Sequence, residues 1–213
     1  MNKGFKIGLI VVIIAVICGI GFLVARNLGS KSVGIDNNVT NEKGKKGKTS
    51  LDSSKVLVVY FSETGNTQKL AKLISDRVGG DFVRIETVQT YPTEYQELAD
   101  FAKNERDKDI HPELKDLNIN IDDYDTIFIG YPIWWYQMPM AMYTFFDTYD
   151  FDGKTIVPFN THEGSGNGGT YDDIKELEPK ATVLEGLPIR GGDMEQDQSS
   201  TVDNWLSKLG FDK

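Results

Sequence analysis

From residue 55 onward, short apolar runs alternate with longer segments in which apolar residues recur at helical spacing. The runs are rich in β-branched residues and bounded by polar or glycine positions, as is typical of buried parallel strands. They predict strands at 55–61, 82–87, 126–130 and 155–159, and a fifth strand at 182–184 and 187–189 that is interrupted at 185–186. Charged and apolar residues alternate in 82–87, so this strand is expected at a half-exposed edge.

The helical pattern is clearest from residue 67 to 78, where Gly79 and Gly80 end it. Further helices are predicted at 95–106, 139–149, 171–177 and 201–209. Strands and helices in strict alternation predict an α/β fold, a doubly wound five-stranded parallel sheet with helices on both faces. Residues 54–213 form this domain, and its ligands are expected at the carboxyl ends of the strands.

The first part of the chain has a different character. Residues 7–25 contain no charged side chain and are just long enough to cross a bilayer. We predict an uncleaved N-terminal transmembrane helix within residues 1–25, because the apolar stretch is too long for a cleavable signal peptide. Cys18 would allow a lipid anchor, but Ile17 stands where lipid-modification signals have a small residue. Residues 26–53 are polar and without periodicity, which predicts a flexible tether.

Charge is divided unevenly between these parts. Residues 1–50 hold 8 of the 23 Lys and Arg and 2 of the 32 Asp and Glu, which leaves 15 basic and 30 acidic side chains for 51–213, a net charge of −15. Such a domain repels nucleic acid, so we exclude nucleic-acid binding. Basic residues flank the span on both sides, and by the positive-inside rule those after it favour an inside domain. The short N-terminus and long tether instead favour a single-pass cell-membrane protein with an extracytoplasmic domain, which is the arrangement we expect.

A hydroxyl-rich turn links the first strand to the first helix and consists of Ser62, Glu63, Thr64, Gly65, Asn66 and Thr67. Its three hydroxyls can donate to phosphate oxygens, and Gly65 lets the backbone approach a ligand beside the free N–H groups of the helix. The spacings of triphosphate loops and dinucleotide fingerprints are both missing. The alternative is an ordinary turn in which Asn66 or Thr64 caps the helix.

Two further loops follow strands and carry unusual residues. The third strand leads into Tyr131, Pro132, Ile133, Trp134, Trp135 and Tyr136, and the fourth into Asn160, Thr161, His162, Glu163, Gly164, Ser165, Gly166, Asn167, Gly168 and Gly169. Hydroxyls for one phosphate, aromatic rings for a flat ring system and glycines for close backbone approach are what flavin mononucleotide (FMN) requires. FMN is therefore the predicted cofactor. The single cysteine excludes a thiolate metal site, and no metal is expected.

On these motifs the domain resembles the flavodoxin-like FMN proteins, whose phosphate loop reads Ser/Thr-x-Thr-Gly-x-Thr, and residues 131–169 resemble a subgroup of single-domain bacterial flavodoxins. The resemblance implies that the loop from Pro132 to Tyr136 packs on the isoalloxazine ring and that Thr161 to Gly168 lies along its other edge. The third loop lacks the acidic, tyrosine-bearing pattern of the best-known electron carriers. This departure argues against an electron-carrier role, but not against FMN as the cofactor.

Three residues of these loops have competing interpretations. Trp134 and Trp135 can fill the core, but two adjacent indoles are too crowded for one core, so at least one is expected on the flavin ring. His162 is either a surface-loop histidine or a catalytic residue near the N1–C2 carbonyl edge. As a catalytic residue, His162 would stabilise negative charge on the reduced ring.

The expected function is an FMN-dependent oxidoreductase that passes electrons from a reduced donor to a small acceptor such as a quinone. The donor would be NAD(P)H or a redox partner protein, and the N-terminal helix would tether the enzyme to the membrane. One alternative is a pure electron-transfer flavodoxin without a substrate of its own. The other is a flavodoxin-fold binding module that has lost FMN, against which the intact hydroxyls at positions 62, 64 and 67 argue.

Overall fold

A computed structural model describes residues 52–211 of the 213. The predicted transmembrane helix at 1–25 and nearly all of the predicted tether at 26–53 lie outside the described residues. Within 52–211, no helix combines the length and the apolar character that crossing a membrane requires.

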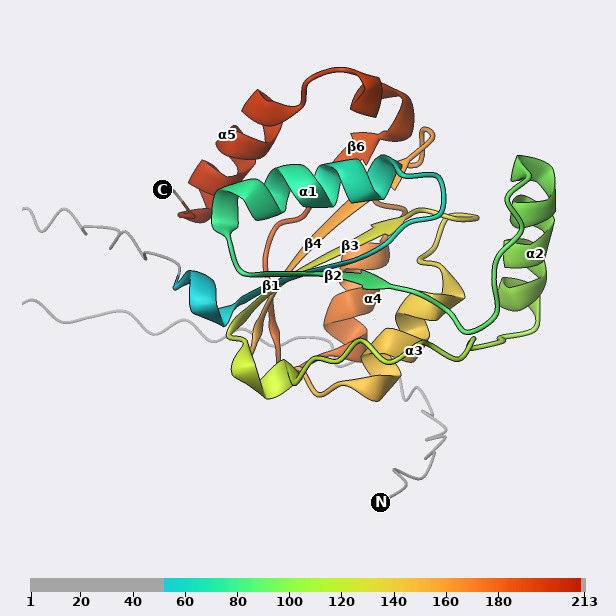
Figure 1. The fold of residues 1–213 in the computed structure, drawn as a ribbon, viewed down its shortest axis with the longest axis horizontal. Coiled ribbons are helices and arrows are strands. Elements are labelled where there is room, and N and C mark those ends of the chain that lie inside the picture. Colours follow the sequence, from blue (N-terminus) through green and yellow to red (C-terminus); the bar gives the residue numbers. More distant parts are fainter. Residues whose placement is uncertain (1–51, 212–213) are drawn as a thin grey trace, which may run out of the picture. The chain divides into compact units, whose positions relative to one another are not determined.

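A parallel sheet forms the centre of the domain, as the alternating pattern predicts (Figure 1). Its strands are β1 (Val56–Phe61), β2 (Asp81–Ile85), β3 (Thr126–Pro132), β4 (Thr155–His162), β5 (Thr182–Val183) and β6 (Leu187–Arg190). The order is β2-β1-β3-β4-β5. β5 pairs with the first residues of β4, and β6 pairs with the last residues of β4 on the same side. The interrupted fifth strand is thereby confirmed, because β5 and β6 occupy one edge in succession. β2 is the other edge and is half exposed, also as predicted.

Helices cover both faces of the sheet (Figure 1). Their bounds are α1 (Asn66–Val78), α2 (Tyr95–Asp107), α3 (Met140–Thr148), α4 (Thr170–Leu177) and α5 (Ser199–Leu209), with short 3-10 turns η1 (Ser53–Lys55), η2 (Ile121–Asp123) and η3 (Gly191–Glu195). α1 and α5 lie on one face, and α3 and α4 lie on the other. α2 stands beside the sheet instead of across it, which brings it to the edge where the strands end.

Strand β1 shows why the sheet has two cores. All six of its residues are buried, and alternate side chains point to opposite faces. Leu57, Val59 and Phe61 pack with α3, whereas Val56, Val58 and Tyr60 pack with α1 and α5. A strand buried on both faces must be apolar throughout, and this is the run that the sequence shows.

Two strands extend further than their apolar runs suggested, which corrects the boundaries predicted at 130 and 159. β3 continues to Pro132 and β4 to His162, because Pro132 pairs with Thr161 and β6 then pairs with β4 as far as His162. Neighbouring strands satisfy the backbone there, so polar side chains do not end the strand. Thr161 and His162 are therefore strand residues with fixed directions, not parts of a loop.

Candidate functional site

A cavity of about 370 Å³ opens at the carboxyl edge of the sheet, beside the switch point between β1 and β3. It is lined by residues of the β1–α1 turn, the ends of β3 and β4, the start of η3 and one side of α2. These residues are Thr64, Asn66, Tyr95, Gln96, Leu98, Ala99, Ala102, Pro132, Ile133, Trp134, Trp135, Thr161, His162, Glu163 and Gly191. Three strand ends and one helix thus converge on a single hollow.

The β1–α1 turn leaves the start of α1 open to a ligand. Gly65 is the N-cap with φ +88° and supplies no side-chain hydrogen bond, and in the first turn the Ser62 hydroxyl accepts only the Gln68 N–H. The alternative in which Asn66 or Thr64 caps the helix is therefore not what the structure shows; both side chains line the cavity instead. A Cβ at Gly65 would meet no atom within 4 Å, so the space above the turn is free. One phosphate group fits this helix terminus.

The turn has two further hydroxyl residues, Ser62 and Thr67, which are buried and form hydrogen bonds within the protein. The Ser62 carbonyl accepts a hydrogen bond from Arg84 Nη2 at 2.6 Å, and its Oγ accepts one from the Gln68 N–H at 3.3 Å. Thr67 Oγ1 lies 2.7 Å from Thr161 Oγ1 and joins α1 to β4. Of the three hydroxyls, Thr64 is the one that lines the cavity.

Glu63 turns away from the cavity toward β2. One of its carboxylate oxygens lies 3.8 Å from Arg84 Nη2. Burial raises the pKa of this carboxyl, and the nearby guanidinium acts against that rise. Arg84 therefore supports the turn by holding both Glu63 and the Ser62 carbonyl.

The aromatic loop forms a tight two-residue turn. Trp134 and Gln137 exchange backbone hydrogen bonds of 3.0 and 3.1 Å, while Trp135 and Tyr136 between them have φ of +53° and +67°. Turns with two left-handed central residues favour Gly, Asn or Asp. Two bulky aromatic residues in this conformation are strained, and such strain persists only where the surroundings enforce it.

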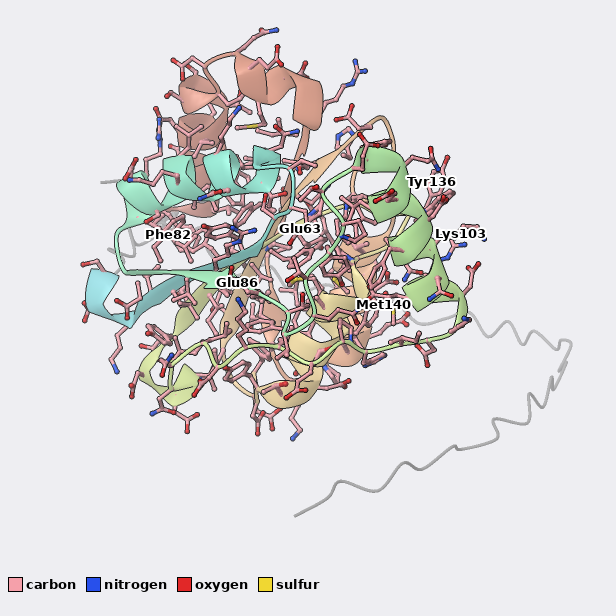
Figure 2. All side chains as sticks on the ribbon, turned by 45° about the vertical axis from the view of Figure 1, so that its right-hand side comes forward. Glu63, Phe82, Glu86, Lys103, Tyr136 and Met140 are labelled. Atoms are coloured by element: carbon pink, nitrogen blue, oxygen red, sulfur yellow. The ribbon has the colours of Figure 1, made fainter. Side chains whose placement is uncertain are left out.

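Two neighbours enforce the turn. On one side the Trp135 indole N–H donates to the Ala99 carbonyl of α2 at 2.9 Å, and the Arg106 guanidinium lies 5.4 Å from the indole centre. On the other side Gly168 packs so closely that a Cβ there would stand 2.9 Å from the Tyr136 carbonyl oxygen. Figure 2 shows Tyr136 beside α2, at the rim of the molecule.

The two tryptophans point in different directions, as their crowding predicted. Trp134 packs edge-on against Phe61 and Tyr91, with ring centroids 5.4 and 5.5 Å apart. Trp135 lies against α2 and keeps 41% of its surface exposed. Both border the cavity, so either ring can contact a flat ligand.

His162 ends β4 and faces the cavity. Its Nδ1 accepts the Gly164 N–H at 2.9 Å, which places the ring proton on Nε2. Burial lowers the pKa of the imidazole, with a smaller opposing effect from Glu163. His162 is therefore a half-buried residue at a strand end, and its Nε2–H is the ring atom left to donate a hydrogen bond.

The structure sorts the remaining candidates. Those that line the cavity are Thr64, Asn66, Pro132, Ile133, Trp134, Trp135, Thr161, His162 and Glu163. Those that do not are Ser62, Glu63, Gly65, Thr67, Tyr136, Gly164, Ser165 and Gly168. The glycine-rich loop stays outside because it folds back on itself: the Gly168 N–H donates to the Ser165 carbonyl and Asn160 Nδ2 to the Gly166 carbonyl.

Sequence reasoning missed the α2 wall and the start of η3. The missed lining residues are Tyr95, Gln96, Leu98, Ala99, Ala102 and Gly191. At Gly191 a Cβ would stand 2.4 Å from Glu163 Oε1 and 2.8 Å from Asn66 Nδ2, so the glycine leaves room for these two side chains of the cavity lining. The weak apolar face of α2, built on alanines, was the one available sign that this helix does not pack flat on the sheet.

Among residues 52–211, no cluster of three or more His, Cys, Asp or Glu could hold a metal ion.

Comparison with known proteins gives a consistent result. A family model described as flavodoxin matches residues 55–209. An NAD(P)H dehydrogenase (quinone) from Archaeoglobus fulgidus is 35% identical over 152 residues, which cover 63% of this chain and 77% of that protein. Flavodoxin 1 of Escherichia coli is 24% identical over 73% of this chain and 80% of its own. The crystal structure of a flavoprotein from Bacteroides eggerthii is similar with a TM-score of 0.62 and 33% identity, covering 73% of this chain and 98% of that one.

Proposed function

Because the chain belongs to the flavodoxin family and FMN is its cofactor, we propose that it is an oxidoreductase that reduces a small acceptor such as a quinone. The net reaction is NAD(P)H + H⁺ + quinone → NAD(P)⁺ + hydroquinone, with a redox partner protein as the other class of donor. When bound, FMN supplies the two-electron chemistry, and the protein supplies binding, orientation and electrostatics.

One observation carries this proposal: the cavity at the strand ends has an apolar wall on α2. Leu98, Ala99 and Ala102 line the cavity there, and a small acceptor that lies on this wall would be beside the flavin. Apolar pockets with a few convergent polar groups are typical of small-molecule sites. The quinone dehydrogenase of Archaeoglobus fulgidus, at 35% identity, supports the same class of reaction.

The polar residues of the cavity have separable roles. The start of α1 and the Thr64 hydroxyl would hold the phosphate, since Thr64 and Asn66 line the cavity and a helix N-terminus favours an anion. The Nε2–H of His162 would donate a hydrogen bond to the ligand, which favours added negative charge on a ring beside it. Trp134 and Trp135 limit the access of water to that ring.

The proposal is tested by steady-state oxidation of NADH and NADPH by the FMN-loaded protein with a quinone as acceptor. Turnover that saturates with quinone supports it. Tight FMN binding together with reduction by a protein donor, but no turnover of either nicotinamide with any quinone, would instead assign a carrier.

A pure electron carrier is the second candidate, and the charge of the domain favours it. Residues 51–213 carry 15 basic against 30 acidic side chains. An acidic surface steers basic partner proteins to the flavin. Rates of reduction by a basic redox protein that fall steeply with salt would support this role.

We also propose that residues 7–25 anchor the protein in the cell membrane with the domain on the extracytoplasmic side. The uncharged stretch of bilayer length and the polar segment that follows it support this arrangement. Protease treatment of intact cells would remove the domain if it lies outside. Protection of the domain until the cells are lysed would reverse the orientation.

A further inference from the structure

The two sides of the cavity differ in chemistry. One side consists of strand ends and turns with hydrogen-bonding groups, among them Thr64, Thr161 and His162. The other side is α2, whose contribution is Tyr95, Gln96, Leu98, Ala99 and Ala102. A phosphate and the polar edge of a flavin find their partners on the first side. The second side has hydrogen-bonding side chains only at Tyr95 and Gln96, and it is apolar at Leu98, Ala99 and Ala102.

The α2 wall carries no charge. Glu97, Asp100 and Lys103 are exposed and do not line the cavity, and Glu105 is buried beside Tyr91, also outside the cavity lining. Figure 2 shows Lys103 on the side of α2 that faces away from the body of the domain. A charged ligand on this wall would lose its hydration without a partner, so the wall favours a neutral ligand.

Small side chains keep the wall open. Ala99 and Ala102 are three residues apart and so share one face of the helix. Inward faces of helices are ordinarily filled by larger aliphatic side chains. Alanine at both positions leaves depth that the fold itself does not use.

The wall is also held in place. The Ala99 carbonyl is bound by the Trp135 indole, and Glu105 at the next inward position accepts a 2.8 Å hydrogen bond from the Tyr91 hydroxyl. From Tyr95 to Ala102 the helix rises by about 10 Å, enough for two fused rings to lie flat. The wall is anchored by two hydrogen bonds, has no charged residue in the cavity lining, and has the length of a bicyclic compound.

We propose that α2 is the acceptor-binding wall of the site and that Ala99 and Ala102 determine which acceptors fit, favouring neutral two-ring quinones. This inference rests on the proposed function and specifies its substrate class. In the reaction the quinone takes up two electrons and two protons to become the hydroquinone. Reduced nicotinamide supplies a hydride, and the other proton comes from solvent.

The test measures binding without turnover. Equilibrium dialysis of 1,4-naphthoquinone and of 1,4-benzoquinone against the oxidised, FMN-loaded full chain, without electron donor, gives both dissociation constants. Ala102→Leu and Ala99→Leu should each raise the constant for the two-ring compound at least about tenfold, with a much smaller change for the single ring. The matched control is Asn104→Leu, which adds the same side chain to an exposed position of α2 and should change neither constant.

Other outcomes separate the two proposals. If Ala99→Leu and Ala102→Leu both bind naphthoquinone as the wild type does, the inference is wrong and the proposed reaction is unaffected. If they lose FMN affinity and leave the quinone constants unchanged, α2 is a wall of the flavin site, which also overturns the inference. A wild-type chain that binds naphthoquinone at α2 but does not oxidise NAD(P)H would overturn the proposed function alone.

Discussion

Helices α1 and α2 each have 13 residues and each follow a strand, yet they relate to the cavity in opposite ways. α1 lies across the sheet, and its N-terminus is at the cavity. It buries four apolar residues and one threonine, namely Thr67, Leu70, Ala71, Ile74 and Val78. α2 stands beside the sheet, lines the cavity with one side, and buries only Leu98, Ala102 and Glu105.

The comparison shows that the two helices are fixed by different forces. α1 is held by packing, because its buried aliphatic face fills the space above β1 and β3. α2 is held largely by specific polar links, through the Trp135 indole and through the buried pair of Tyr91 and Glu105. Changes in α1 should therefore affect the stability of the fold, and changes in α2 should affect the shape of the cavity.

The largest effect that separates the helices is on stability. Leu70 is fully buried between α1 and the sheet, so Leu70→Ala should lower the free energy of unfolding by about 2–5 kcal/mol. Leu98→Ala should cost less than half as much, because Leu98 borders the cavity and its removal only enlarges a space that is already open. Denaturant unfolding of the two variants measures both values, and equal losses would contradict the distinction.

The second effect is on phosphate recognition. Thr64→Ala should weaken FMN by about 1.5–3 kcal/mol, since it removes a hydrogen bond to a charged oxygen, and should leave riboflavin almost unaffected. Thr67→Ala breaks the buried link to Thr161 instead, so it should lower stability and weaken both ligands alike. Titration of each variant with FMN and riboflavin checks this. A phosphate-selective loss in Thr67→Ala would mean that its hydroxyl leaves Thr161 when ligand binds.

These two threonines also show how far sequence reasoning reaches. The pattern of the turn predicted a turn at the cavity, where Thr64 and Asn66 lie, because a strand, hydroxyls, a glycine and a helix start determine the local backbone. It did not separate Thr64 from Thr67, since both are hydroxyls in one turn. Their difference arises from Thr161, which is 94 positions away from Thr67 in the sequence. Contacts between distant segments decide which hydroxyl faces the ligand.

The same reasoning explains why the α2 wall was missed. The helix itself was predicted within one residue of its end, because helical periodicity is a local property. Its position beside the sheet depends on the long segment between α2 and β3 and on the aromatic turn. The strained conformation of Trp135 and Tyr136 could not be predicted either, since their residue types disfavour it.

A third effect concerns the link between α2 and the aromatic turn. Trp135→Phe keeps an aromatic ring but removes the indole N–H that donates to Ala99, at a cost of about 0.5–1.5 kcal/mol. Backbone amides of α2 should then exchange hydrogen faster, while those of α1 keep their protection. Trp205→Phe is the matched control, because its indole N–H donates to the Glu185 carbonyl near α5. Equal exchange in α2 for both variants would show that the turn does not hold the helix.

The smallest effect is the pH dependence of the buried carboxyl on α2. Burial raises the pKa of Glu105 above its ordinary value, so the folded protein holds this proton more tightly than the unfolded chain. As pH rises from the ordinary pKa of glutamate through the raised one, the wild type should lose stability relative to Glu105→Gln. The amide of this variant does not titrate, and its oxygen can still accept the Tyr91 hydroxyl.

Asp107, two residues further along the helix, supplies the control with the opposite sign. Hydrogen bonds from Lys103 and Arg106 hold the pKa of its exposed carboxyl below the usual range. The wild type should therefore lose stability relative to Asp107→Asn as pH falls from the ordinary pKa of aspartate through the lowered one. Unfolding measured across both windows should give opposite slopes for the two variants. A flat difference for Glu105→Gln would mean that water reaches this carboxyl, and α2 would then be attached to the domain by the aromatic turn without the support of a buried pair.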